Sequence, residues 1–392
     1  AVGWVGRDET TTVVLPAGGE RARGEAGGAS GRSGSGRHAG SGRPLVGNGF
    51  DPAAIYRERA DGVVTIYALF GTHAENGRGD AAQGSGFVVS RGGYILTNSH
   101  VITTAGDEQP DAEPKAATTI YVEFRDGDRV AARIVGWDLF DDVGVLKVEQ
   151  GAHPLIPVPL GDSSRVAVGQ PVAAIGSPFG EVSSLSAGIV SATERSIASL
   201  TSEYNVVDAI QTDAPINRGN SGGPLLDGRG RAIGINAQIR SESGTAEGVG
   251  FAIPIDAAVR SMRQLIATGR VRYAWVGIAT QTLTPALSRR FALPVRRGAA
   301  IQSVVAGSPA AKAGLRAGGE EEEFAGIDFR PGGDVVVAID GTEVETAEDV
   351  VREVTERLPG EHLAFTVQRG SEQRVVDVVL GERPSTPPDA GR

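Results

Sequence analysis

The most informative stretch of this sequence sets one serine among three glycines, and it reads Asp213-Ala214-Pro215-Ile216-Asn217-Arg218-Gly219-Asn220-Ser221-Gly222-Gly223-Pro224. A serine hydroxyl attacks an amide carbonyl only when a neighbouring base removes its proton. The attack builds negative charge on the carbonyl oxygen, which backbone N–H groups in a tight turn stabilise. Glycines let the main chain adopt such a turn and let substrate come close. The stretch indicates a nucleophile turn, and the competing interpretation is a Gly-rich β-turn with an exposed serine.

Two motifs upstream of this turn supply an imidazole and a carboxylate. His100 follows an apolar run at once, after Gly84-Ser85-Gly86-Phe87-Val88-Val89 and within Gly93-Tyr94-Ile95-Leu96-Thr97-Asn98-Ser99-His100-Val101. An imidazole of near-neutral pKa can act as general base and then as general acid. Three aspartates, Asp138, Asp141 and Asp142, precede the apolar run Val143–Val148. A buried carboxylate can orient an imidazole, although a surface histidine and a solvated acidic loop are the alternatives.

Short apolar runs separated by turn signals predict two series of β-strands. The first series is Val63–Phe70, Gly86–Val89, Tyr94–Thr97, Thr119–Phe124, Val130–Val135 and Val143–Val148. The second is Pro171–Ile175, Leu185–Ser191, Asp208–Thr212, Pro224–Leu226, Ala232–Ile239 and Gly250–Ile253. In Ala232–Ile239 the apolar residues alternate, which is typical of a half-buried strand. We therefore expect a mostly β protein with two six-stranded antiparallel β-barrels.

Helices are expected at both ends of this β region. Asp51-Pro52 predicts a short helix through Arg59, because Asp caps helices and Pro suits the first helical position. A second helix is expected after Asp256 as its cap, and Gly269 stands at its exit. The apolar face of that helix is predicted to contain Ala258, Met262, Leu265 and Ile266.

The segment from about residue 274 to 382 predicts a small α+β domain. Ser308-Pro309-Ala310 opens a short helix that Gly314 ends. Asp334–Ile339 and Leu363–Val367 are predicted strands, and Thr346 with Asp349 forms a capping-box-like helix start between them. The apolar stripe predicted for that helix is Val350, Val351, Val354 and Leu358. The run Glu320–Pro331 is interpreted as a solvated loop because it contains four glutamates.

The order His, Asp, Ser resembles the chymotrypsin-like proteases, and the local motifs are similar to those of the HtrA (Deg) family. The shared motifs are Thr-Asn-x-His-Val, an Asp before a short apolar strand ending near Lys, and Gly-Asn-Ser-Gly-Gly-Pro. The resemblance spans about Val63 to Leu380. It implies His100 as base, Asp142 as orienting acid and Ser221 as nucleophile. Asp142 is preferred over Asp141 and Asp138 because it immediately precedes the strand.

The resemblance also implies the remaining site residues. The oxyanion hole would be the N–H groups of Gly219 and Ser221. The substrate pocket would be walled by Ile235, Asn236 and Ala237, which favours cleavage after small or medium aliphatic residues. The C-terminal domain looks like a PDZ domain, whose Trp275-Val276-Gly277-Ile278 would bind a C-terminal peptide by strand addition. The implied chemistry needs no metal and no cofactor.

Domain organisation and location are expected as follows. Residues 1–50 form a Gly-rich tether, with 12 glycines between residues 17 and 49. Residues 51–269 form the trypsin-like protease domain, residues 274–382 the PDZ domain, and residues 383–392 a disordered tail. The family implies an extracytoplasmic location in the periplasm or cell envelope. The apolar start at Ala1 suggests the end of a membrane tether lying upstream.

Composition excludes some classes of protein and partner. The chain of 392 residues has 48 acidic against 38 basic residues, which argues against a nucleic-acid partner. It contains no cysteine, so disulfides and thiolate metal sites are excluded. The family resemblance implies unfolded protein substrates and C-terminal peptides as partners. Within that family, the short Gly71–Ala82 segment and the single PDZ domain imply a homotrimer.

Two other functions compete with this interpretation. The serine motif also satisfies the G-x-S-x-G elbow of α/β-hydrolases. That fold needs a helix after the serine, whereas Pro224 and a turn follow here, and only His362 lies downstream of Ser221. The second alternative is a PDZ-containing holdase with latent protease activity. Replacing Ser221 by Ala separates the holdase from the protease, because holdase activity survives that change and proteolysis does not.

Overall fold

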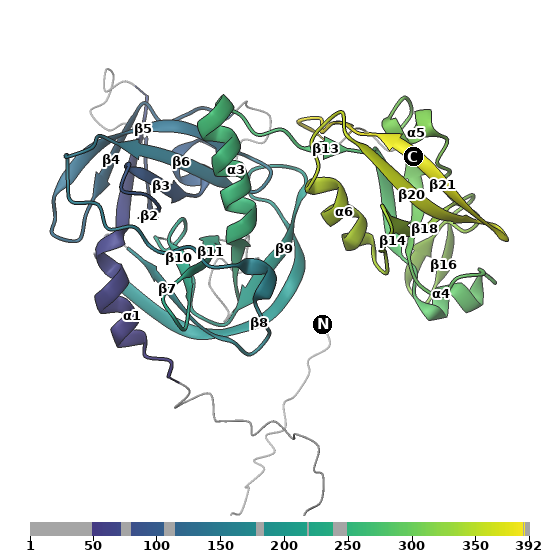
Figure 1. Ribbon diagram of the computed structural model, residues 1–392, viewed down its shortest axis with the longest axis horizontal. Helices are drawn as coiled ribbons and strands as arrows, with labels where there is room; N and C mark the ends of the chain where they lie inside the picture. The colour runs from purple at the N-terminus through teal and green to yellow at the C-terminus, as the bar shows by residue number, and fades with distance from the viewer. Residues whose placement is uncertain are drawn as a thin grey trace, which may run out of the picture. The chain divides into compact units, whose positions relative to one another are not determined.

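The computed structural model describes residues 49–71, 80–105, 114–177, 184–217, 219–237, 249–386 and 388. The predicted tether therefore lies outside the described residues, apart from its last two positions. Within the described ranges no helix is both long enough and apolar enough to cross a membrane. The predicted fold class is confirmed, since two closed antiparallel barrels precede a smaller α+β domain (Figure 1).

The first barrel closes in the strand order β1-β2-β3-β6-β5-β4. Its strands are β1 Val63–Phe70, β2 Asp80–Val88, β3 Tyr94–Thr97, β4 Thr119–Glu123, β5 Arg129–Asp138 and β6 Val143–Val148. The helix α1, Pro52–Arg59, precedes it, and the Asp51 carboxylate accepts from the Ala54 N–H at 2.9 Å as the sequence predicted. A one-turn helix, α2 Ser99–Ile102, follows β3 and presents His100.

The second barrel closes in the order β10-β11-β12-β9-β8-β7. Its strands are β7 Pro171–Gly176, β8 Ser184–Ala198, β9 Asn205–Thr212, β10 Pro224–Asp227, β11 Ala232–Ala237 and β12 Gly250–Pro254. Two 3-10 turns, η1 Ala60–Gly62 and η2 Ser163–Arg165, join neighbouring elements. The prediction that β11 is half-buried is wrong, because α3 (Ile255–Thr268) packs on it and both of its faces are buried.

A continuous apolar core joins the barrels. Phe87 and Leu96 of the first barrel belong to the same buried cluster as Ile175 and Ile235 of the second, with Leu265 of α3 packed among them. Burial contributes about 25 cal/mol per Å² of apolar surface, so this shared core favours one fixed arrangement of the two barrels. That arrangement is what holds side chains from different barrels together.

Two details of α3 differ from the sequence-based expectation. Pro254, not Asp256, precedes the helix, and Asp256 lies in its first turn. The Asp256 carboxylate accepts instead from the N–H of Ser163, at 2.9 Å, and from its hydroxyl, at 2.6 Å. Ile266 is 40% exposed and does not belong to the buried face.

The C-terminal domain is built on a sheet of strand order β14-β15-β18-β20-β21, with β19 paired to β18. Its elements are β13 Ala274–Trp275, β14 Ile278–Thr282, α4 Pro285–Arg290, β15 Ala299–Val304, α5 Pro309–Ala313, β16 Glu322–Phe324, β17 Ile327–Phe329, β18 Val335–Ile339, β19 Thr342–Glu343, α6 Ala347–Thr355, β20 His362–Arg369, β21 Glu372–Val379 and β22 Gly381–Glu382. The predicted capping box is confirmed, because Thr346 and Asp349 each bond the other's backbone.

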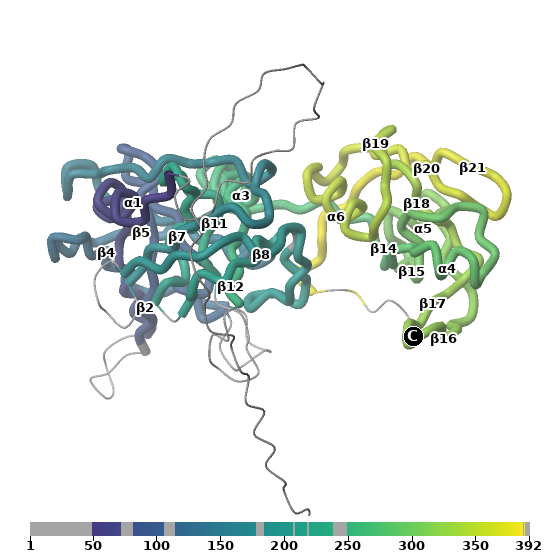
Figure 2. The backbone as a smooth tube through the Cα atoms, turned by 90° about the horizontal axis from the view of Figure 1, so that it is seen from below, coloured from purple at the N-terminus to yellow at the C-terminus, as the bar shows by residue number. Residues whose placement is uncertain are grey.

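Two predictions for this domain are wrong. The Glu320–Pro331 run is not a plain loop, because β16 and β17 form a hairpin in it (Figure 2). Phe329 anchors this hairpin, being fully buried and stacked on Phe291 with ring centroids 5.1 Å apart. Leu358 is 49% exposed, because α6 ends at Thr355 before the apolar stripe reaches it.

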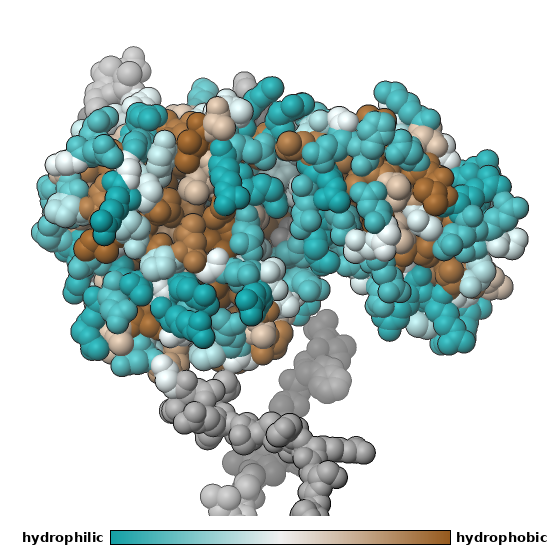
Figure 3. Space-filling model, viewed as in Figure 1, coloured by the Kyte–Doolittle hydropathy of each residue, from teal (hydrophilic) through white to brown (hydrophobic). Residues whose placement is uncertain are grey.

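The molecular surface is mixed in character. Hydrophilic side chains surround apolar patches on the face drawn in Figure 3. Such mixing is ordinary for a folded chain, since apolar atoms supply more than half of a typical protein surface. The surface pattern by itself therefore identifies no site.

Candidate active site

Asp142 lies at the tight β5–β6 connection and is 3% exposed. Its φ of 51° is left-handed, a conformation that Asp tolerates better than most residues. Its Oδ1 accepts from the Ser99 hydroxyl at 2.7 Å and from the His100 N–H at 3.0 Å. Its backbone carbonyl accepts from the Asn98 amide at 2.8 Å. The carboxylate is thus held from several directions, with Oδ2 left to face the imidazole.

The His100 ring is paired with that carboxylate. Its Nδ1 lies 2.7 Å from Asp142 Oδ2. Burial opposes the charged form of His100, but the attraction of the Asp142 carboxylate and the hydrogen bond to it outweigh burial. The pKa of His100 is therefore raised above its ordinary value. The pairing leaves Nε2 as the ring nitrogen available to a proton donor.

Ser221 lies in the turn between β9 and β10 and is 4% exposed. Its Oγ has no hydrogen-bond partner among the described residues, so the structure does not join it to His100. Such contacts are often loose without substrate. The two motifs are nevertheless neighbours, because a Cβ placed on Gly84 would lie 2.6 Å from Val101 and 3.2 Å from the Ser221 carbonyl oxygen.

The turn presents two unengaged backbone donors. The N–H groups of Gly219 and Ser221 donate to no acceptor among the described residues. Gly219 has a φ of 100°, which glycine adopts at little cost. Two free N–H groups on either side of Asn220 can together bind an anionic oxygen.

The other aspartates of the motif are engaged elsewhere. Asp138 Oδ2 lies 2.5 Å from the Tyr273 hydroxyl and 2.6 Å from the Ser261 hydroxyl. Asp141 Oδ2 lies 2.7 Å from the same Tyr273 hydroxyl and 3.2 Å from an Arg260 nitrogen. Burial, and then repulsion from Asp141, raise the pKa of Asp138 to about 6. Of the three aspartates, Asp142 alone bonds the imidazole.

The predicted pocket residues Ile235, Asn236 and Ala237 are buried on β11. Asn236 lies against the nucleophile turn, because its carbonyl accepts from the Gly222 N–H at 2.9 Å. Its side chain donates to the Pro224 carbonyl at 3.2 Å, and its Oδ1 has no partner in the described part of the chain. The strand β11, Ala232–Ala237, contains no acidic residue.

The predicted peptide-binding segment lies at the start of an edge strand. Gly277 has a φ of 83°, and a Cβ there would lie 2.3 Å from Ser308 Cβ, so only glycine fits. Among the described strands, the strand that follows, β14, pairs only with β15. An edge strand of this kind has free backbone groups that can pair with an extended peptide.

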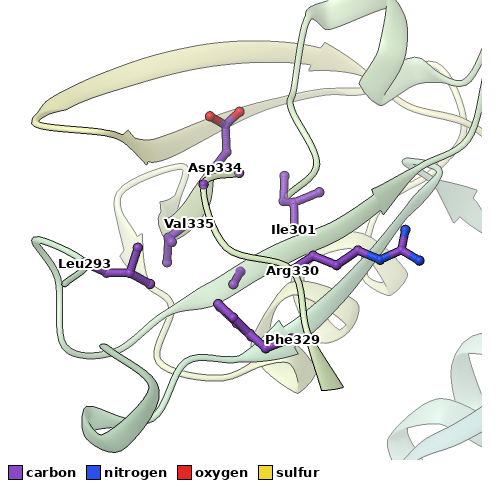
Figure 4. Close-up of a pocket in the computed structure, with 9 residues that line it drawn as sticks. Leu293, Ile301, Phe329, Arg330, Asp334 and Val335 are labelled. Carbon is purple, nitrogen blue, oxygen red and sulfur yellow. The ribbon is translucent and has the colours of Figure 1, made fainter. Parts of the chain in front are cut away.

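A small hollow in the same domain is a separate feature. Leu293, Ile301, Phe329, Arg330 and Asp334 are among the side chains around it (Figure 4). It leaves essentially no room for even a water molecule, whereas ligand pockets usually measure about 300–1,000 Å³. The hollow therefore does not compete with the barrel residues as a catalytic centre.

Sequence reasoning overlooked three contributors: Asn98 and Ser99, which bond Asp142, and Ser85, which bonds the nucleophile turn. All three stand inside the quoted motifs, but nothing in a motif tells which hydroxyl or amide reaches across to another strand.

Two closed six-stranded barrels with a bonded His–Asp pair beside a Gly-Asn-Ser-Gly-Gly turn have the architecture of chymotrypsin-like serine peptidases. Family models agree: residues 84–235 match a trypsin-like peptidase domain, and residues 275–380 match a PDZ domain. Among solved structures, "HtrA-type protease AlgW with tripeptide" is 34% identical with a TM-score of 0.68, and the match covers 87% of this chain and 100% of that one. The chain belongs to the HtrA family of serine proteases.

Curated relatives point the same way. A "Probable periplasmic serine endoprotease DegP-like" of Hahella chejuensis is 40% identical over 302 residues, which are 77% of this chain and 57% of the relative. A protein of the same description from Halomonas elongata is 39% identical over 319 residues, 81% of this chain and 60% of the relative. The chain thus spans about three fifths of the length of these relatives.

Proposed function

We propose that this chain is an HtrA-type serine endopeptidase that hydrolyses peptide bonds in unfolded or damaged envelope proteins. The observation that carries the proposal is the 2.7 Å bond between His100 Nδ1 and Asp142 Oδ2, together with the Ser221 hydroxyl, which has no partner among the described residues. Names of the relatives, which include "serine endoprotease" and "periplasmic", support the activity and an extracytoplasmic location.

The proposed mechanism is acyl transfer by the chain's own residues. His100 Nε2 takes the proton of Ser221 Oγ as the oxygen attacks the peptide carbonyl, and Asp142 stabilises the imidazolium. The N–H groups of Gly219 and Ser221 bind the carbonyl oxygen as it becomes negative, each contributing about 3–4 kcal/mol. His100 then protonates the leaving amine, and water hydrolyses the acyl-enzyme. Ile235, Asn236 and Ala237 would select small or medium aliphatic residues.

Control through the PDZ domain is the second part of the proposal. A C-terminal peptide would add to β14, with its carboxylate at the backbone of Trp275–Ile278. The free edge of β14 supports this, as do the AlgW structures described "with tripeptide" and "with decapeptide". The short Gly71–Ala82 segment and the single PDZ domain support a homotrimer, and the apolar residues at the start of the sequence support a membrane tether. Sedimentation and membrane fractionation measure these two properties.

Digestion of casein tests the proposal most simply. Wild type and Ser221→Ala are compared with and without a hydrophobic C-terminal peptide. Casein loss with wild type only, faster with the peptide, supports both parts. Equal digestion by the two proteins would remove Ser221 from the mechanism. Suppression of casein aggregation by both proteins without cleavage would favour the alternative, a PDZ-containing holdase.

A further inference from the structure

Ser85 of β2 belongs to the first barrel, but its side chain bonds the second. It is fully buried. Its hydroxyl donates to the carbonyl of Gly219 at 2.5 Å and accepts from the N–H of Ser177 at 2.9 Å. Ser177 directly follows β7, and Gly219 stands two residues before Ser221. One hydroxyl therefore ties the nucleophile turn both to the strand beside it and to the opposite barrel.

The main chain of Ser85 holds the same turn at a second point. Its N–H donates to the Ser221 carbonyl at 2.8 Å, and its own carbonyl accepts from the Thr97 hydroxyl at 2.7 Å. Both residues that present free N–H groups, Gly219 and Ser221, thus have their carbonyls bonded to Ser85. A bonded carbonyl fixes the peptide plane that follows its Cα, so the N–H on the other side of that Cα can change direction only through the φ and ψ of that one residue.

The space around Ser85 is closed by glycines. A Cβ on Gly222 would lie 2.1 Å from the Ser85 carbonyl oxygen, and a Cβ on Gly176 would lie 3.0 Å from the Ser85 hydroxyl oxygen. A Cβ on Gly223 would lie 3.2 Å from the Ser85 Cβ. This packing keeps Gly219 and Ser221 within reach of one small hydroxyl residue.

We propose that Ser85 is a positioning residue for the oxyanion hole: its hydroxyl and its N–H hold the carbonyls of Gly219 and Ser221, and so aim the N–H groups of these two residues at the substrate oxygen. The inference rests on the proposed function. It assigns Ser85 no contact with substrate, because its effect passes through the turn. If the Ser85 hydroxyl served only stability, its removal would change the affinity for a transition-state analogue and the affinity for a ground-state ligand by the same factor.

The test separates these two roles. In Ser85→Ala the N–H bond stays and the hydroxyl bonds are lost. Two ligands are compared. The first is a peptide boronic acid, whose adduct with a serine mimics the tetrahedral intermediate. The second is the same peptide with its scissile peptide bond reduced, so that it has no carbonyl to place in the oxyanion hole. We expect Ser85→Ala to lower kcat and boronate affinity at least 10-fold, with reduced-peptide affinity within about twofold; one missing oxyanion donor costs about 10²–10³ in kcat.

The matched control is Thr103→Val. Thr103 is also buried, and its hydroxyl also donates to one backbone carbonyl, Ser99 at 2.8 Å, and accepts from one N–H, Ala105 at 3.2 Å. This variant should lower Tm about as much as Ser85→Ala but keep the ratio of boronate to reduced-peptide affinity. If Ser85→Ala does not fold, Ser85→Cys, which keeps a weaker donor, is compared with the same control.

The outcomes are distinct. Loss of boronate affinity in the Ser85 variant alone supports the inference. Equal losses for both ligands, no loss for either, or the same change of ratio in Thr103→Val overturns it. If wild type itself neither cleaves peptide nor binds the boronate at Ser221, the proposed function fails as well, and the two failures are told apart by that wild-type measurement.

Discussion

Replacing Asp142 by Asn should leave the fold in place and put the proton on the wrong nitrogen of His100. The carboxylate accepts from Ser99 and the His100 N–H through Oδ1, and faces His100 Nδ1 through Oδ2 at 2.7 Å. An amide keeps one acceptor oxygen for the first two donors and turns its NH₂ group toward Nδ1. Nδ1 must then accept, so the proton moves to Nε2, which can no longer take a proton from Ser221.

The expected loss is large. An Asp-to-Asn change that reverses the tautomer lowers kcat by about 10⁴ in a serine protease of this type. That factor corresponds to about 5 kcal/mol of transition-state stabilisation at about 1.4 kcal/mol per tenfold. The loss of folding stability is smaller, about 1–3 kcal/mol, because only the charge assistance of the bonds disappears.

Asp141→Asn is the matched control. Asp141 is also buried, but it bonds Tyr273 and Arg260 and not the imidazole. Its replacement should change Tm and leave kcat within about tenfold, because His100 keeps its partner. The two variants make the same chemical change at adjacent residues, so they differ only in whether the lost carboxylate bonds the imidazole or the Tyr273 hydroxyl and Arg260.

The assay is the pH dependence of kcat/KM for a fluorogenic peptide amide, together with Tm. In wild type the attraction of Asp142 raises the pKa of His100, so activity should fall as the pH drops through a value above about 6.5, the usual histidine pKa. In Asp142→Asn the residual activity should have its acid limb at lower pH. The reasoning is refuted if Asp142→Asn stays within tenfold of wild type, or if Asp141→Asn loses as much.

Two further predictions concern the groups around this site. Burial and repulsion from Asp141 raise the pKa of Asp138 to about 6. Folded protein then holds a proton that the unfolded chain loses near pH 4, so the free energy of unfolding should fall by up to about 3 kcal/mol between pH 4 and pH 7. Asp138→Asn should flatten this slope in urea titrations, and an unchanged slope would exclude Asp138 as its source. Gly222→Ala should lower Tm by several degrees and abolish cleavage, because the φ of Gly222 is 86° and the new Cβ would lie 2.1 Å from the Ser85 carbonyl oxygen. If this variant keeps the Tm and the activity of wild type, the turn accommodates the Cβ and the prediction is wrong.

The sequence predicted most of the fold because short-range signals coincide there. Val63–Phe70, Tyr94–Thr97 and Val143–Val148 are apolar runs bounded by turn residues, and the structure has each with the predicted bounds. The burial of both faces of β11 was missed, because the pattern of a strand does not tell what packs on its outer side. The β16–β17 hairpin was missed because the glutamate run masked the apolar anchor at Phe329.

The site was predictable in part, because its three motifs are short and each is contiguous in the sequence. The three motifs pointed to His100, Asp142 and Ser221 by residue type and chain order, and their catalytic roles stay predictions. The hydrogen bonds of Ser85 and Ser99 could not be predicted, because they join residues 134 and 43 positions apart and depend on how the strands are paired. A hydroxyl inside a motif has no local signal for its distant partner.

Covalent labelling tests the central claim, that Ser221 is an activated nucleophile. The protein is incubated with a fluorophosphonate, and its intact mass and peptide map are measured. A single adduct is predicted, located on Ser221 and absent from Ser221→Ala, with His100→Ala reacting far more slowly. An adduct on another serine, or casein cleavage by a wild-type protein that the reagent does not modify at Ser221, would contradict the account.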